Sequence, residues 1–139
     1  MDPFNLQRFV DAQRDTYSEA YAELKSGRKA SHWMWFVFPQ LKGLGHSYNA
    51  NYFGISSLAE AKAYLEHPVL GPRLRECTTA VNAVSGRTAH EIFGSPDDMK
   101  FRSSMTLFAR ATSDDSIFAK ALRKYFGGRE DERTVELLK

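Results

Sequence analysis

Two stretches of the chain carry most of the residues whose types and spacing suit chemistry. In the first, Trp33 and Trp35 lie two positions apart, Gln40 follows them, and His46 stands in the glycine-punctuated turn GLGHS. Aromatic faces stack on the flat rings of bases and also bind sugars, and Tyr52 adds a further ring. A loop histidine suits proton transfer or phosphate contact. This stretch predicts a surface for a flat ligand, with His46 as a candidate catalytic residue.

The second stretch begins a predicted helix that presents an acid, a cation and a hydroxyl on one face. Asp97, Lys100 and Ser104 follow at steps of three and four residues, the spacing of neighbours on a helix surface. Asp97 is the second candidate catalytic residue, and Lys100 and Ser104 are candidate ligand contacts. The plainer interpretation is a surface pair between Asp97 and Lys100, which stabilises a helix by only about 0.2–0.5 kcal/mol.

The tryptophans and the glycine turn of the first stretch could each have a purely structural role, and the sequence leaves this alternative open. On a strand the two tryptophans would share one face, whereas on a helix they diverge by about 200° and at most one faces a pocket. Packing of both indoles in the core is the plainer alternative. The turn GLGHS lacks the Lys-Ser/Thr ending of a phosphate-binding loop, and His46 would be inert if the turn is simply an exposed loop.

The sequence offers no pattern for a metal centre or a bound cofactor. Its four histidines form no HExxH pair, and Cys77 is the only cysteine, so we predict neither a metal site nor an intrachain disulfide. No nucleophile lies in an elbow sequence with partners for a catalytic triad. Whether the protein is an enzyme therefore stays open.

Composition is that of an ordinary globular protein. The chain has 139 residues, 42% of them hydrophobic and 26% charged, which fits one domain with one core. Its 19 basic and 17 acidic residues give a net charge of +2, with no specific signal for nucleic acid. No apolar run approaches about 18 residues, and the N-terminus lacks the apolar region of a secretory signal. We expect no membrane span and a cytoplasmic location.

The elements that must position the candidate residues are mostly helices. Apolar stripes, caps and terminal glycines predict helices over about 5–26, 57–66, 68–84, 88–93, 95–112 and 113–126. Segment 31–38 is either a buried strand or, slightly favoured, a buried helix. Segment 40–56 is a long loop, a type that is commonly functional in so small a domain. The predicted fold is mainly α: an irregular single helical domain over 1–128 with one long aromatic and glycine-rich loop, then a charged tail over 129–139, helical or frayed.

Three sequence blocks resemble a known family. They are SHWMWFVFPQLKGLGHS (31–47), YLEHPVLGPRL (64–74) and IFGSPDDMKFRSSMTLFA (92–109). In this order they resemble the bacterial "domain of unknown function 1810", over nearly the whole chain. The resemblance implies a mainly helical fold and leaves the activity open. The residue pattern of block 97–108 is also similar to the NADAR group, small helical proteins linked to ADP-ribose chemistry. This similarity implies a nucleotide-like ligand.

The leading hypothesis is a ligand pocket where the tryptophan segment, the GLGHS turn and the helix after Ser95 meet. Its small-molecule ligand would be nucleotide-like or ADP-ribose-like, and His46 with Asp97 would serve any hydrolysis. The meeting of these segments is an assumption. The alternative is a non-catalytic protein-interaction module that exposes the aromatic side chains of segment 48–53, with homodimerisation left open.

Overall fold

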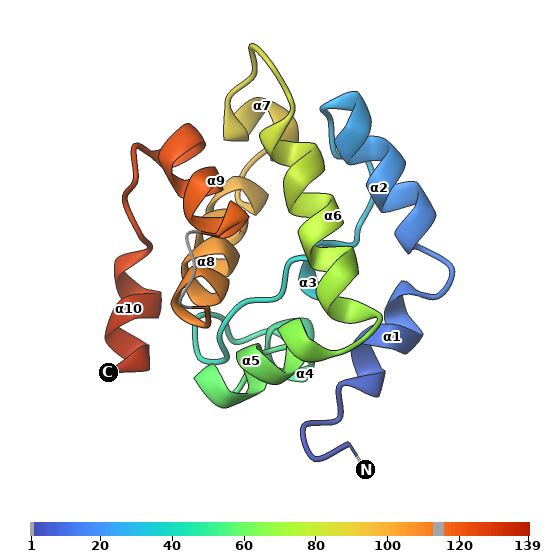
Figure 1. The fold of residues 1–139 in the computed structure, drawn as a ribbon, viewed down its shortest axis with the longest axis vertical. Helices are drawn as coiled ribbons and strands as arrows, with labels where there is room; N and C mark the ends of the chain where they lie inside the picture. Colours follow the sequence, from blue (N-terminus) through green and yellow to red (C-terminus); the bar gives the residue numbers. More distant parts are fainter. Residues whose placement is uncertain (1, 113–115) are drawn as a thin grey trace.

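The residues that the structure describes, 2–112 and 116–139, are mostly helical in this computed structural model (Figure 1). No β-strand forms within those ranges, where Leu41 and Ile55 make an isolated bridge. The mainly α class predicted from the sequence is confirmed. In chain order the helices are α1 (Gln7–Gln13), α2 (Tyr17–Ser26), α3 (Met34–Val37), α4 (Tyr48–Tyr52), α5 (Leu58–Glu66), α6 (Leu70–Asn82), α7 (Ala89–Phe93), α8 (Asp97–Arg110), α9 (Ile117–Phe126) and α10 (Glu132–Leu138).

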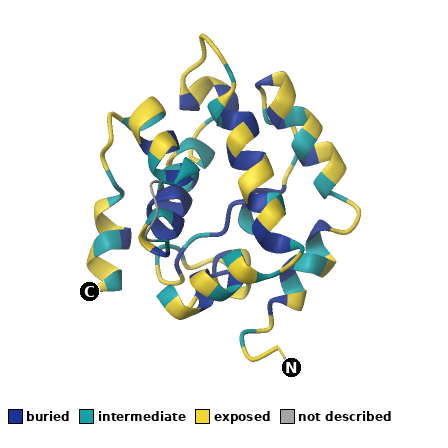
Figure 2. Cartoon of the chain, in the orientation of Figure 1, coloured by how far each residue is buried: buried dark blue, intermediate teal, exposed yellow. Residues whose placement is uncertain are grey.

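Helix α8 is the element around which much of the protein packs. Helices α3, α5, α7, α9 and α10 all contact it, and its buried face carries Phe101, Met105 and Phe108, as the predicted stripe requires. Helix α6 packs in turn against α2, α5 and α9. Figure 2 shows buried positions along α8 and on the sides of the surrounding helices that face the interior. Because α8 is held on several sides, the start of this helix is a firm support for Asp97 and Lys100.

The sequence predicted one continuous helix over about 5–26, and this prediction is wrong. The chain forms two helices, α1 and α2, with a turn at 14–16 between them. Helix α1 packs against α3 whereas α2 packs against α6, and one straight helix could not follow both partners. The Asp2 carboxylate accepts the amides of Leu6 and Gln7 at 2.8 and 2.9 Å at the start of α1, while Asn5, where the predicted helix begins, has a positive φ of 52°.

Other predicted helix ends are confirmed. Gly27 ends α2 in the left-handed conformation, with φ of 84°. The Ser57 hydroxyl accepts the Glu60 amide at 3.2 Å and starts α5. Within the described part of the chain, the Glu60 carboxylate does not bond the Ser57 amide in return and instead accepts the amide and hydroxyl of Ser56 at 2.9 and 2.7 Å.

The C-terminal third contains a complete capping box and a helical tail. Thr88 and Glu91 exchange hydrogen bonds at the start of α7. The predicted helix start near 113 lies outside the described residues, and α9 is described from Ile117 onward, behind its cap Ser116. The charged tail is helical rather than frayed: α10 starts behind its cap Asp131 and packs against α8.

Segment 31–56 folds into short elements rather than an open loop. The helix favoured for 31–38 is confirmed as the single turn α3. Within the long predicted loop, Ser47 caps the short helix α4 by accepting the Ala50 amide at 3.1 Å. The two ends of the loop are joined by backbone hydrogen bonds, since the Lys42 amide donates to Ile55 at 2.8 Å and the Ile55 amide donates to Gln40 at 2.9 Å. The loop therefore closes on itself.

The core is built largely from aromatic rings. Phe101 stacks on Phe93 with ring centroids 4.6 Å apart and meets Phe38 edge to face at 5.0 Å. Cys77 lies in the same core, and burial raises the pKa of its thiol to about 12. No helix in the described ranges is long and apolar enough to cross a membrane.

Candidate functional site

A cleft of about 240 Å³ opens where the segment between α3 and α5 meets the start of α8 and the start of α10. Its apolar and aromatic wall includes Trp35, Leu41, Leu44, Phe53 and Met99. Its polar lining includes Gln40, Lys100, Ser103, Asp131 and Arg133. An apolar wall with a few convergent polar groups is the usual make-up of a small-molecule site.

Lys100 is held at this cleft by an aromatic ring and a carboxylate. Its Nζ lies 4.1 Å from the Trp35 ring centroid, within cation–π range, and 3.3 Å from Asp97 Oδ1. The other carboxylate oxygen of Asp97 lies 2.8 Å from Lys29 Nζ. Two ammonium groups thus share one carboxylate, so this cluster carries a net positive charge beside the aromatic wall.

Helix α10 supplies a second cation to the cleft. Asp131 Oδ2 accepts the amide and hydroxyl of Thr134 at 3.0 and 2.6 Å, so this carboxylate serves as the cap of α10. Arg133 donates only a long hydrogen bond of 3.4 Å, to the Gly43 carbonyl, within the part of the chain that the structure describes. A guanidinium can grip a phosphate or carboxylate with two hydrogen bonds. Lys100 and Arg133 thus bring two positive charges to the lining of the cleft, and Asp131 brings one negative charge.

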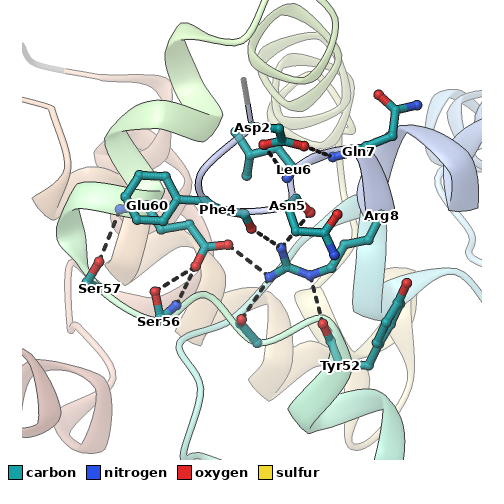
Figure 3. A network of polar contacts seen from close by, with 11 residues as sticks. Asp2, Phe4, Asn5, Leu6, Gln7, Arg8, Tyr52, Ser56, Ser57 and Glu60 are labelled. Atoms are coloured by element: carbon teal, nitrogen blue, oxygen red, sulfur yellow. Dashed lines mark hydrogen bonds and ion pairs between the residues drawn. The ribbon is translucent and has the colours of Figure 1, made fainter.

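Arg8 fastens the loop that lines the cleft (Figure 3). Its Nε donates to the Tyr52 carbonyl at 2.7 Å, and one terminal nitrogen donates to the Gly54 carbonyl at 3.1 Å and pairs with Glu60 at 2.9 Å. The Arg8 and Glu60 side chains are only 8% and 3% exposed. The other terminal nitrogen donates to the carbonyls of Phe4 and its neighbour at 2.6 and 2.8 Å. One planar guanidinium thus ties the N-terminus, the loop and α5 together.

Gly54 is required where the loop approaches itself. A Cβ atom at this position would lie 2.7 Å from the Ala50 carbonyl oxygen and 2.8 Å from Lys42 Cβ. No side chain fits without moving backbone, so this glycine serves close packing of the loop. Gly54 also lines the cleft, so the shape of the cleft depends on this close contact between parts of the loop.

The structure brings part of the predicted site together. Trp35, Gln40 and Lys100 all line the cleft, so the tryptophan segment and the helix after Ser95 do meet. Asp97 does not line the cleft, and its carboxylate is engaged by two lysines at the start of α8. Its placement suits orientation of Lys100 more than proton transfer to a ligand.

Trp33 and Ser104 lie in the core and do not line the cleft. Both are fully buried, and a side chain without exposed surface cannot touch a ligand in this conformation. The indole of Trp33 donates to Glu23 at 2.8 Å, while Trp35 reaches the cleft, so the two rings separate as the helical alternative requires. The Ser104 hydroxyl has no hydrogen-bond partner in the described ranges, because the helix turns it into the core.

His46 and Tyr52 lie outside the cleft. The His46 side chain is exposed, and its neighbour Gly45 lines the cleft in its place. Tyr52 is 43% exposed and stacks on Tyr48, which is 76% exposed. These two rings border a separate hollow beside Arg8. The structure therefore does not assemble His46 and Asp97 into one catalytic pair.

Sequence reasoning missed the contribution of the tail. Asp131 and Arg133 line the cleft, although the tail was expected to lie beyond the domain. The acid at 131 before a helical run is a capping signal, and it could have located α10. Nothing in the local sequence indicates that this helix returns to α8. No group of three or more His, Cys, Asp or Glu side chains in the described residues could hold a metal ion.

Comparisons with known proteins agree on the family and the fold. The family model described as "Protein of unknown function (DUF1810)" matches residues 3–138. The chain is similar to the crystal structure of the conserved hypothetical protein Rv1873 from Mycobacterium tuberculosis, with 62% identity and a TM-score of 0.97, over 99% of this chain and 98% of that chain. No curated protein matches the chain. These comparisons do not show the similarity to the NADAR group that the block 97–108 suggested.

Proposed function

The chain belongs to the DUF1810 family of proteins of unknown function, and we propose that its cleft binds a small nucleotide-like ligand, a molecule with a flat ring and a phosphate. The observation that carries this proposal is Lys100, held 4.1 Å above the Trp35 ring and 3.3 Å from Asp97 at the cleft wall. The aromatic wall suits the ring, and the ammonium suits the phosphate.

The size of the cleft limits the ligand. Its volume of about 240 Å³ lies below the roughly 300–1,000 Å³ of pockets for drug-sized ligands. A mononucleotide therefore suits it better than a whole ADP-ribose molecule, of which the cleft would hold one half. Gln40 and Ser103 also line the cleft, and their side chains offer hydrogen bonds to sugar hydroxyls.

The proposal is for binding and does not extend to hydrolysis. Catalysis would need an acid or base within hydrogen-bond reach of the ligand. His46 does not line the cleft, and Asp97 is paired with Lys29 and Lys100. Neither candidate catalytic residue is therefore placed for proton transfer.

Tryptophan fluorescence tests the proposal directly. Trp33 is sealed in the core whereas Trp35 lines the cleft, so ligand-dependent emission changes would come from Trp35. We expect AMP to change this emission in a saturable manner. Lys100→Gln removes a charge-assisted hydrogen bond of about 1.5–3 kcal/mol, so it should weaken AMP binding by about 10- to 100-fold.

Lys62→Gln is the matched control, because Lys62 is an exposed lysine on α5 that does not line the cleft. This variant should bind AMP as the wild type does. ADP-ribose serves as the second probe and should bind more weakly than AMP. An emission that stays flat with both nucleotides, or equal losses in the two lysine variants, would overturn the proposal.

A second candidate function follows from the exposed tyrosine pair. The rings of Tyr48 and Tyr52 lie parallel with centroids 5.6 Å apart on the outer face of α4, and exposed aromatic groups are common at protein interfaces. Phe53, by contrast, is half-buried against the core. If this pair mediates self-association, light scattering should show a dimer that the double variant Tyr48→Ser, Tyr52→Ser converts to a monomer. Equal masses for the two proteins would speak against it.

A further inference from the structure

Helix α10 is held on the protein chiefly by polar contacts near its start. Arg110 forms two hydrogen bonds of 2.7 Å with the Glu130 carboxylate, and Arg102 donates to the backbone carbonyls of Arg129 and Glu130 at 2.9 Å. The Arg110 and Glu130 side chains are 46% and 34% exposed. Of the described residues of α10, only Thr134 is buried. Leu138 packs half-buried against the core, so α10 has little fully buried apolar surface and we expect its local stability to be low.

Hollows lie beside α10 on several sides. The cleft borders its first turn at Arg133. Another hollow runs along Glu132, Val135 and Glu136, and a third opens between Leu58 and the end of α10. Figure 1 shows the helix at the edge of the molecule, next to α8 and joined to α9 by an extended connection. Surface depressions therefore border α10 on several sides, while α8 packs against it.

A pair of glycines precedes this segment. Gly127 and Gly128 have φ values of 63° and 79°, in the left-handed region that glycine adopts without strain. A Cβ atom at Gly127 would meet nothing within 4 Å, so no packing contact requires glycine there. The amides of Gly127 and Gly128 both donate to the Leu122 carbonyl and cap the end of α9, so these glycines mark the point at which the chain leaves a packed helix for segment 129–139.

We propose that segment 129–139, the strap, opens and closes as a unit about Gly127 and Gly128, and that the closed strap brings Arg133 onto the anionic group of the ligand. The second half of this inference rests on the proposed function, whereas the opening does not. The long hydrogen bond from Arg133 to Gly43 is easily exchanged for two short ones to a phosphate. A ligand that gains these bonds only in the closed state shifts the strap toward closure.

Hydrogen exchange of the free protein tests the opening. Amides of α10 should exchange together, and faster than those of α6 and α8. Arg110→Gln removes the clamp on Glu130 and should accelerate exchange of the strap by about two- to fivefold, the effect of one exposed ion pair. Arg14→Gln is the matched control, since it breaks the exposed pair of Arg14 with Asp11 on α1 and should leave the strap unchanged. Exchange in α10 as slow as in α8 would overturn the opening.

Exchange and binding with AMP test the closure. AMP should slow exchange of the strap, and Arg133→Gln should weaken AMP binding by about tenfold. Arg129→Gln should bind normally, because Arg129 lies on the strap but does not line the cleft. If AMP binds through Lys100 but neither protects the strap nor needs Arg133, the closure is wrong and the proposed function stands. If AMP does not bind at all, the proposed function and the closure fail together, and the free-protein exchange still decides the opening.

Discussion

The Glu23 side chain organises the connection between α2 and α3. Its carboxylate accepts the amides of Ala30 and Ser31 at 2.7 and 3.0 Å, the Ser31 hydroxyl at 2.5 Å and the Trp33 indole at 2.8 Å. Burial alone would raise the pKa of this carboxyl, but the hydrogen bonds outweigh burial and lower the pKa to about 2. The chain between α2 and α3 is therefore organised around one ionised group, and Trp33 is held in the core by it.

The lowered pKa of Glu23 predicts an acid-sensitive contribution to stability. The folded pKa of about 2 lies below the ordinary 4.5, so the stabilisation is complete above about pH 4.5 and is lost as the pH falls toward 2. Glu23→Gln should lower the free energy of unfolding at pH 7 by about 1–2 kcal/mol and flatten its slope between these pH values. Urea unfolding across the pH range measures both. Glu66→Gln, at an exposed position on α5, should keep the wild-type slope, and the prediction fails if the two variants behave alike.

At the scale of elements, the short helices depend on contacts that their own sequences do not contain. Helix α4 is brief, and it is held because Arg8, from α1, binds the carbonyls of Tyr52 and Gly54. Isolated helices of this length are unstable in water. The aromatic and glycine-rich pattern of segment 40–56 predicted a functional loop, but the pattern could not show which of its residues face the cleft.

Gly54 offers the sharpest test of this closed loop. Gly54→Ala places a methyl group 2.7 Å from the Ala50 carbonyl oxygen, so we expect a loss of about 1–3 kcal/mol in the free energy of unfolding and weaker AMP binding through the distorted cleft. Gly45→Ala is a graded control, because its methyl group would meet only the Ala50 side chain, at 3.0 Å. Denaturant unfolding should rank the two variants in this order. A Gly54→Ala protein as stable as wild type would contradict the close approach.

At the scale of the whole molecule, the cleft exists only because distant parts of the chain meet. Trp35 and Gln40 come from one region, Lys100 from the start of α8, and Arg133 from the last helix. Helix α8 makes this meeting possible, since α3 and α10 both pack against it. The strap adds the Arg133 cation to the cleft. In the proposed equilibrium, ligand binding therefore favours the state in which α10 is docked.

The sequence by itself determined the mainly helical class and several helix ends, because helical periodicity, caps such as Thr88 and terminal glycines such as Gly27 act within a few residues. Only the tertiary structure decided the break between α1 and α2, the burial of Trp33 and Ser104, and the arrival of Arg133 at the cleft. Those features come from packing between residues far apart in the chain, which local periodicity does not encode.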